Sequence, residues 1–177
     1  EAIAAPRPTL AEMRGTVEGA RDGLVLRIGS ETFRGTLYYG LIPFEDTKYP
    51  QPVYFKSPVS IENGRAEVNI NTLGDRYDMT GWRALQKGVI GYRILDQEGS
   101  PLYEGRVGFK GTGPFEVDDT LLEGPFISLL SENGATIHFE TNNKLRCQVI
   151  INEKTFKGKA GTTHEISIDG LSPDTEY

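Results

Sequence analysis

The chain contains few of the residues that build disulfides or metal sites. Of its 177 residues one is a cysteine, Cys147, and two are histidines, so no disulfide can form within the chain and a histidine-rich metal centre is excluded. No apolar run approaches the ~18 residues of a membrane-spanning helix, so we expect no transmembrane segment. The net charge is −6, with acidic and basic residues interspersed. Such a surface repels a phosphate backbone, so we expect no nucleic-acid partner.

Most of the hydrophobic periodicity has a period of two, which is typical of strands with one buried and one solvated face. The alternation is clear over residues 24–28, 66–70 and 103–109. Asn63-Gly64 and Asn133-Gly134 are strong hairpin turns, because both residue types tolerate a positive φ. The sequence therefore predicts an all-β fold.

The composition changes over Gly111–Gly124, where Gly, Pro and acidic residues gather and a second series of alternating strands begins. Only residues 80–87 read as a helix, of about two turns. We therefore expect two β-sandwich domains. The segments are an N-terminal linker (1–9), an accessory β-sandwich or partly open barrel (10–117), a linker (118–122) and a second sandwich, incomplete at its C-terminal end (123–177).

The second domain resembles a fibronectin type III-like module. The segment GPFISLLSENGATIHFETN, residues 124–142, is similar to the first two strands of such modules, and the tail from Gly170 resembles the family's L-x-P-x-T-x-Y corner. In that family the Leu fills the end of the core, the Pro and Thr shape the turn, and the Tyr anchors the corner by a backbone hydrogen bond. The family's tyrosine opens its penultimate strand, so the resemblance implies that about two more strands follow. The matching corner residues are Leu171, Pro173, Thr175 and Tyr177.

Residues 123–142 are similar, more narrowly, to the module that precedes the catalytic domain in secreted calcineurin-like metallophosphoesterases of the purple acid phosphatase type. The resemblance implies an extracellular, periplasmic or cell-surface protein. It also implies a catalytic domain beyond Tyr177 as the partner of this segment, with a divalent metal pair in that domain alone. The present segment is then a non-catalytic region that positions or shields the enzyme.

The segment itself has no complete catalytic motif. A metallophosphoesterase needs two metal ions held by Asp, His and Asn, and Gly74-Asp75 is the only fragment of that pattern. We interpret His138 and His164 as surface histidines, and Cys147 as a small core residue on the inner face of a strand. Asp118 and Asp119 are the carboxylate pair best placed to hold calcium between two domains, although solvated turn carboxylates are the simpler interpretation.

A second function comes from a different class, a carbohydrate-binding or adhesion module of a cell-surface protein. Such modules stack exposed aromatic rings on sugars while carboxylates bind the hydroxyl groups. The alternative for the tryptophan is that it plugs the end of the first sandwich, held there by the short helix. The candidate glycan-binding residues are Trp82, Tyr77, Asp75 and Asp78.

Overall fold

The computed structural model describes residues 8–43, 58–74 and 80–177. The chain folds into two compact units, Glu1–Asp118 and Asp119–Tyr177. Antiparallel sheets make up both units, which confirms the prediction of an all-β, sandwich-like fold. The division falls inside the 118–122 segment, between a strand that ends at Asp118 and one that begins at Leu121.

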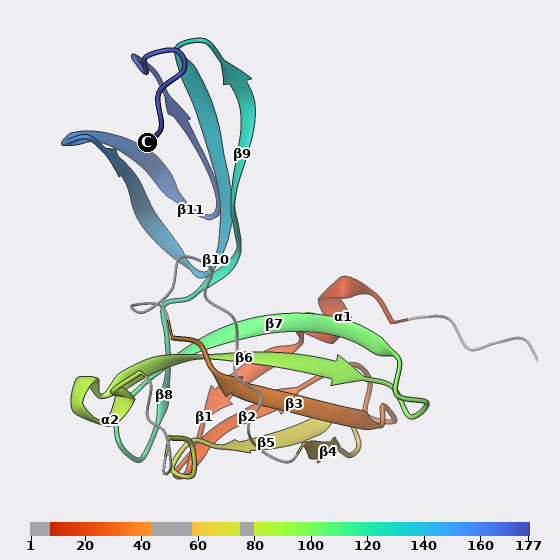
Figure 1. The fold of residues 1–177 in the computed structure, drawn as a ribbon. Coiled ribbons are helices and arrows are strands. Elements are labelled where there is room, and N and C mark those ends of the chain that lie inside the picture. Colours follow the sequence, from red (N-terminus) through yellow and green to blue (C-terminus); the bar gives the residue numbers. More distant parts are fainter. Residues whose placement is uncertain (1–7, 44–57, 75–79) are drawn as a thin grey trace, which may run out of the picture. The chain divides into compact units, whose positions relative to one another are not determined.

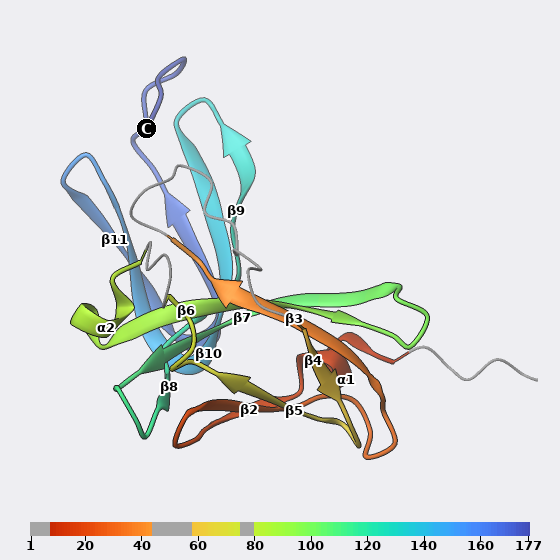
Figure 2. The same cartoon turned by 60° about the horizontal axis from the view of Figure 1, so that its bottom comes forward.

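The first unit contains a three-stranded and a five-stranded sheet, which Figures 1 and 2 show as two layers. The three-stranded sheet has the order β1-β2-β5, with β1 Thr16–Gly19, β2 Gly23–Arg27 and β5 Arg65–Asn69. The five-stranded sheet has the order β4-β3-β6-β7-β8, with β4 Val59–Ile61, β3 Gly35–Leu41, β6 Lys87–Leu95, β7 Pro101–Lys110 and β8 Glu116–Asp118.

The apolar side chains of the predicted alternating stretches fill the core of this unit. Leu24 and Leu26 of β2 pair with Val68 and Ala66 of β5, and all four side chains are buried. One face of each sheet is therefore withdrawn from water, which stabilises the fold by about 25 cal/mol for each Å² of apolar surface buried.

Two short helices close the ends of this unit. The predicted helix is shorter than expected, because α2 covers only Trp82–Leu85 and β6 already begins at Lys87. The sequence analysis missed α1, Leu10–Arg14, and placed Thr9 in a linker. Thr9 and Glu12 form a capping box, a start signal that the sequence carries.

The second unit is one antiparallel sheet of order β11-β10-β9. The pairing of β10 with β11 breaks between Glu140 and Leu145, where β10 carries four residues that have no matching partners on β11. The two strands bend there, and Figures 1 and 2 show their halves diverging as two arms. The strands are β9 Leu121–Ser131, β10 Gly134–Ile151 and β11 Lys154–Ile168.

We call the two arms the proximal limb (residues 121–141 and 162–168) and the distal limb (145–161). The sequence predicts separate strands at 135–141 and 145–151, whereas the structure joins them into β10 and marks their junction by the bend. The facing sides of the limbs are in close contact at Gly158. A Cβ added there would lie only 3.1 Å from Cδ1 of Ile166 in the other limb. The unit is thus a sheet folded over on itself.

Candidate functional site

Trp82 lies in the core of the first unit. Its side chain is 2% exposed, and its ring centroid lies 5.6 Å from that of Phe109 and 5.8 Å from that of Phe115. The indole N–H donates to the Leu73 carbonyl oxygen at 3.0 Å. The ring therefore offers no open face to a sugar, and the structure places it as the plug that the alternative interpretation describes.

The other three candidate glycan-binding residues, Asp75, Tyr77 and Asp78, lie outside the described residues. The described surface of the first unit has a shallow depression over the outer side of β2 and β5. Two of its charged side chains, Arg65 and Glu67, form an ion pair with each other. Exposed ion pairs of this kind are common on solvated sheet faces and contribute little to stability.

The residues of the expected corner come together in the second unit. The Ser172 N–H donates to the Tyr177 hydroxyl oxygen at 2.7 Å, and the Thr175 hydroxyl donates to the Pro173 carbonyl at 3.0 Å. The donated N–H lowers the pKa of Tyr177, because it stabilises the phenolate. The tyrosine thus ties the end of the segment back to its start by a backbone hydrogen bond.

Leu171 attaches the same segment to the turn between β9 and β10. Its N–H donates to the Asn133 carbonyl at 2.9 Å, and the Asn133 side-chain amide donates to the Leu171 carbonyl at 3.2 Å. Two reciprocal hydrogen bonds therefore hold the tail against the open end of the proximal limb.

The interpretation of His164 as a surface histidine is wrong. The side chain is 2% exposed and stacks on the Phe139 ring at 4.6 Å between centroids. Its Nε2 lies 3.0 Å from Thr141 Oγ1 and 3.7 Å from Cys147 Sγ. Sequence reasoning missed this environment because the neighbours come from β10, whereas the alternation of β11 alone shows one more polar residue.

The hydrogen bonds of this cluster indicate which atoms donate and which accept. The Thr141 hydroxyl donates to the Asn143 carbonyl at 2.8 Å, so its oxygen accepts from the Nε2–H of His164. The Nδ1 atom is buried and has no hydrogen-bond partner among the described residues. Burial, reinforced by the negative charge of Asp119, raises the pKa of the Cys147 thiol. A thiol held in its protonated form is a poor nucleophile, so the cluster has the chemistry of a core rather than of an active site.

His138 lies on the opposite side of the proximal limb. Its Nδ1 is 4.0 Å from the Glu165 carboxylate, and the two residues are directly opposed across β10 and β11. Both side chains are partly or fully exposed, so this histidine matches the expected surface position.

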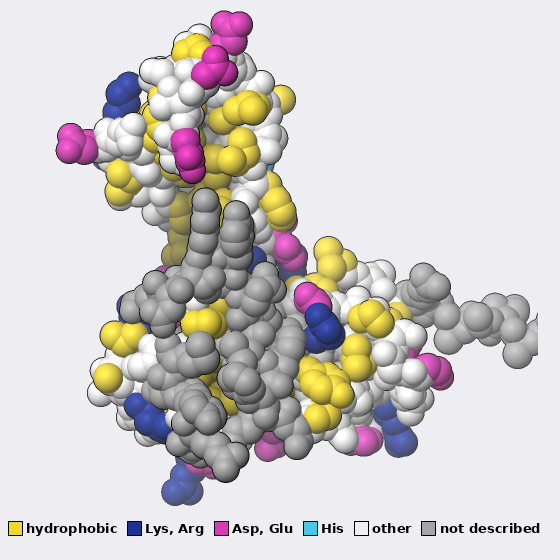
Figure 3. Space-filling view, viewed as in Figure 1, with side chains coloured by type: hydrophobic (Ala, Val, Ile, Leu, Met, Phe, Trp, Pro, Cys, Tyr) yellow, Lys and Arg dark blue, Asp and Glu magenta, His cyan; other side chains and the backbone are white. Residues whose placement is uncertain are grey.

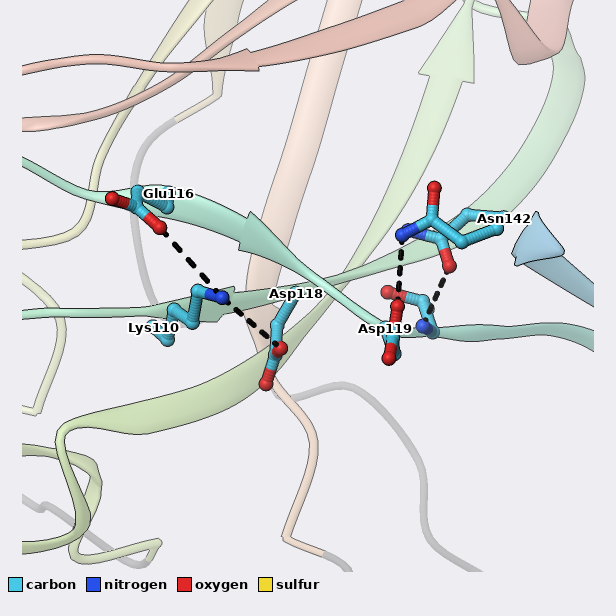
Figure 4. A network of polar contacts seen from close by, with 7 residues as sticks. Lys110, Glu116, Asp118, Asp119 and Asn142 are labelled. Carbon is cyan, nitrogen blue, oxygen red and sulfur yellow. Dashed lines mark hydrogen bonds and ion pairs between the residues drawn. The ribbon is translucent and has the colours of Figure 1, made fainter. Parts of the chain in front are cut away.

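Asp118 and Asp119 bind different partners (Figure 4). Within the first unit, Lys110 Nζ lies 4.0 Å from Asp118 and 3.6 Å from Glu116. Within the second, Asn143 Nδ2 donates to Asp119 at 2.8 Å. Among residues 8–43, 58–74 and 80–177, no three His, Cys, Asp or Glu side chains are placed to hold a metal ion together.

The central strand of the second unit has an unpaired stretch, in addition to the outer edges of β9 and β11. The pairing of β9 with β10 ends at Leu121 and Thr141, and β10 beyond that point pairs with β11 alone. In an antiparallel ladder every second residue directs its N–H and C=O away from the partner. The segment 145–151 therefore presents a row of backbone donors and acceptors that no strand of the described chain covers.

Apolar side chains accompany this edge. Along 145–151 the side chains alternate between half-buried and exposed, and the half-buried ones are all apolar or cysteine. Figure 3 shows hydrophobic side chains in yellow over the surface of the second unit. The large exposed ones are Phe126, Ile127, Leu129, Leu130 and Ile150, each more than half exposed.

Neither helix in the described part of the chain has the length and hydrophobicity needed to cross a membrane. Residues 119–177 thus contain a tyrosine-anchored corner, several exposed apolar side chains and a strand edge that no described strand covers. No family model, no curated protein and no solved structure matches this chain.

Proposed function

We propose that the chain is the non-catalytic β-sandwich region of a larger secreted or surface protein, and that further strands of that protein complete its second unit. The region positions or shields a catalytic domain attached through those strands. The observation that carries the proposal is the unpaired edge of β10 at residues 145–151, whose half-buried side chains are all apolar or cysteine.

An edge of this kind is costly when it stays open. Unpaired N–H and C=O groups form a template for pairing with other chains, and proteins usually cover or blunt such edges. Contiguous exposed apolar side chains likewise mark surfaces that another element covers. Strands added at the free edge would extend the sheet beside the half-buried apolar side chains of 145–151.

The corner supports the same assignment. The Tyr177 hydroxyl accepts a backbone N–H five residues upstream, which is the hydrogen bond expected where a sandwich turns into its next strand. Together with the similarity of residues 123–142, this hydrogen bond supports a fibronectin-like second unit. The attached domain that the similarity favours is a metal-dependent phosphoesterase, which would hold the divalent metal pair.

The experiment compares residues 1–177 with the longer polypeptide encoded by the same gene. Amide hydrogen exchange in both proteins reports whether residues 145–151 become paired, and hydrolysis of p-nitrophenyl phosphate with and without Mn²⁺ reports the attached activity. We expect the amides of 145–151 that point to the free edge to exchange at least tenfold more slowly in the longer protein. The amides of β2 and β5 in the first unit serve as the internal control and stay unchanged.

The two parts of the proposal can fail separately. Unchanged exchange at 145–151 in the longer protein would refute the completed sandwich. Protected amides without metal-dependent hydrolysis would retain the structural role and refute the phosphoesterase. Trp82 is buried, so the ring predicted to stack on a sugar in the glycan-binding alternative is not accessible.

A further inference from the structure

The charges of the second unit are separated along its length. All five of its Lys and Arg residues lie between positions 144 and 159, where Glu153 is the only acidic residue. The remaining eight acidic residues of the unit lie outside that stretch, where the unit has no Lys or Arg. The distal limb is therefore a basic arm: residues 145–161 carry a net charge of +3 and Lys144 directly precedes them, on a chain whose total charge is −6.

Of the basic side chains on the outer face, Arg146 stands beside the free edge, whereas Lys157 lies one strand away from it on β11. Arg146 is exposed and lies on β10 between the half-buried Leu145 and Cys147, so it points to the outer face of the limb. Lys157 is exposed opposite Gln148, which is on the same outer face. Neither Arg146 nor Lys157 forms an ion pair with any residue in the described part of the chain.

The inner face of the same limb is apolar. Val149 and Phe156 face each other across β10 and β11, and both are half-buried. A strand that pairs with 145–151 alternates its own side chains between these two faces. Apolar side chains would extend the inner face, and side chains on the other face would lie beside Arg146, Gln148 and Ile150, with Lys157 one strand further away.

We propose that the free edge of the distal limb docks an extended segment in which hydrophobic and acidic residues alternate, the acidic ones lying on the face of Arg146 and Lys157. This inference rests on the proposed function for the presence of an added strand, and it specifies the chemistry of that strand. Main-chain hydrogen bonds along 145–151 supply affinity, and the two faces supply selectivity. Opposite charges on neighbouring strands are favourable, and like charges are unfavourable.

The test uses residues 1–177 and four labelled nine-residue peptides with blocked ends. The first alternates Val with Glu, the second Val with Lys and the third Val with Ser. The fourth has the composition of the first in blocks, Val-Val-Glu-Glu-Val-Val-Glu-Glu-Val, and cannot place its apolar side chains on one face. Fluorescence anisotropy gives the affinities, and amide hydrogen exchange locates the binding edge.

We expect the alternating Glu peptide to bind about tenfold more tightly than the Lys peptide at low salt, because Arg146 attracts the one and repels the other directly across the new pair of strands, and Lys157 adds to both effects from one strand further away. The Ser peptide should fall between them, and the difference should shrink at 0.5 M NaCl because salt screens exposed charges. The block peptide should bind weakly. Protection from exchange should appear at 145–151.

Charge reversal on the limb provides the matched variant. Replacing both cations, Arg146→Glu with Lys157→Glu, should invert the preference so that the Lys peptide binds more tightly than the Glu peptide. Arg34→Glu makes the same kind of change at an exposed position of the first unit, and should leave the preference unchanged. If the double variant loses its β-sheet circular dichroism, the single Arg146→Gln variant replaces it. This variant should reduce the preference for the Glu peptide over the Lys peptide from about tenfold to about threefold.

Three results would overturn the inference. These are equal affinity for the Glu and Lys peptides, absence of binding by every peptide, and protection confined to β9 or to the outer edge of β11. Each is separate from the test of the proposed function, since the longer protein can protect 145–151 with a strand that carries no acidic residues.

Discussion

Replacing Trp82 tests whether its ring is a structural plug. The side chain is 2% exposed and contacts two aromatic rings, and its N–H is bonded to the carbonyl of Leu73, itself a buried residue. Trp82→Ala removes the ring and leaves a cavity, which costs about 3–5 kcal/mol in the free energy of unfolding. Trp82→Phe keeps an aromatic ring but removes the hydrogen bond and part of the buried area, so we expect a loss of about 2–3 kcal/mol.

The assay is urea unfolding at 25 °C followed by far-ultraviolet circular dichroism. Leu85→Ala is the matched control, because Leu85 lies on the same helix and is 50% exposed; it should change the stability by less than about 0.5 kcal/mol. Trp82 is the only tryptophan, so the wild-type fluorescence should have a short-wavelength maximum and be weakly quenched by acrylamide. Strong quenching, or a loss below about 1 kcal/mol in Trp82→Ala, would refute the placement of the ring in the core.

Three further predictions concern single residues. Gly15→Ala should destabilise the first unit by more than about 2 kcal/mol in urea unfolding, because Gly15 has φ +56° and an added Cβ would overlap the Arg27 carbonyl oxygen. Cys147 should react with iodoacetamide at pH 8 at least several-fold more slowly in the folded protein than in urea, because burial and the charge of Asp119 raise its pKa. Tyr177→Phe should accelerate amide exchange throughout the C-terminal corner, because the hydroxyl that accepts a backbone N–H is lost.

The raised pKa of the Cys147 thiol also makes the stability of the fold depend on pH. Because folding raises the pKa of Cys147, the folded state is favoured while the thiol is protonated, and this contribution is lost as the pH rises through the thiol pKa. Stability measured by urea unfolding should therefore decline more steeply above pH 9 in the wild type than in Cys147→Ser. Parallel curves for the two proteins would contradict the raised pKa, and equal alkylation rates in the folded and unfolded states would do so independently.

The alternation of side chains determines the fold class of this chain by itself. Because neighbouring side chains of a strand point to opposite faces, stretches such as 24–28 and 66–70 can bury one face only as strands, and β2 and β5 form there. Turn chemistry is local in the same way, so Asn63-Gly64 could be placed between two strands from the sequence alone, and both residues have a positive φ between β4 and β5. The turn expected at Asn133-Gly134 forms one residue earlier, because Gly134 already belongs to β10. The capping box of Thr9 and Glu12 was available too, and its omission is why α1 was missed.

Only the tertiary structure determines which side chains of the second unit are buried and which strand edge is left unpaired. The burial of His164 depends on Phe139 and Thr141, which are more than twenty residues away and reach it only across paired strands. The free edge at 145–151 likewise follows from where the pairing with β9 stops, and no local pattern encodes that point. Local propensity sets which way each side chain points, whereas the neighbours that cover it come from distant parts of the chain and exist only once the sheet has formed.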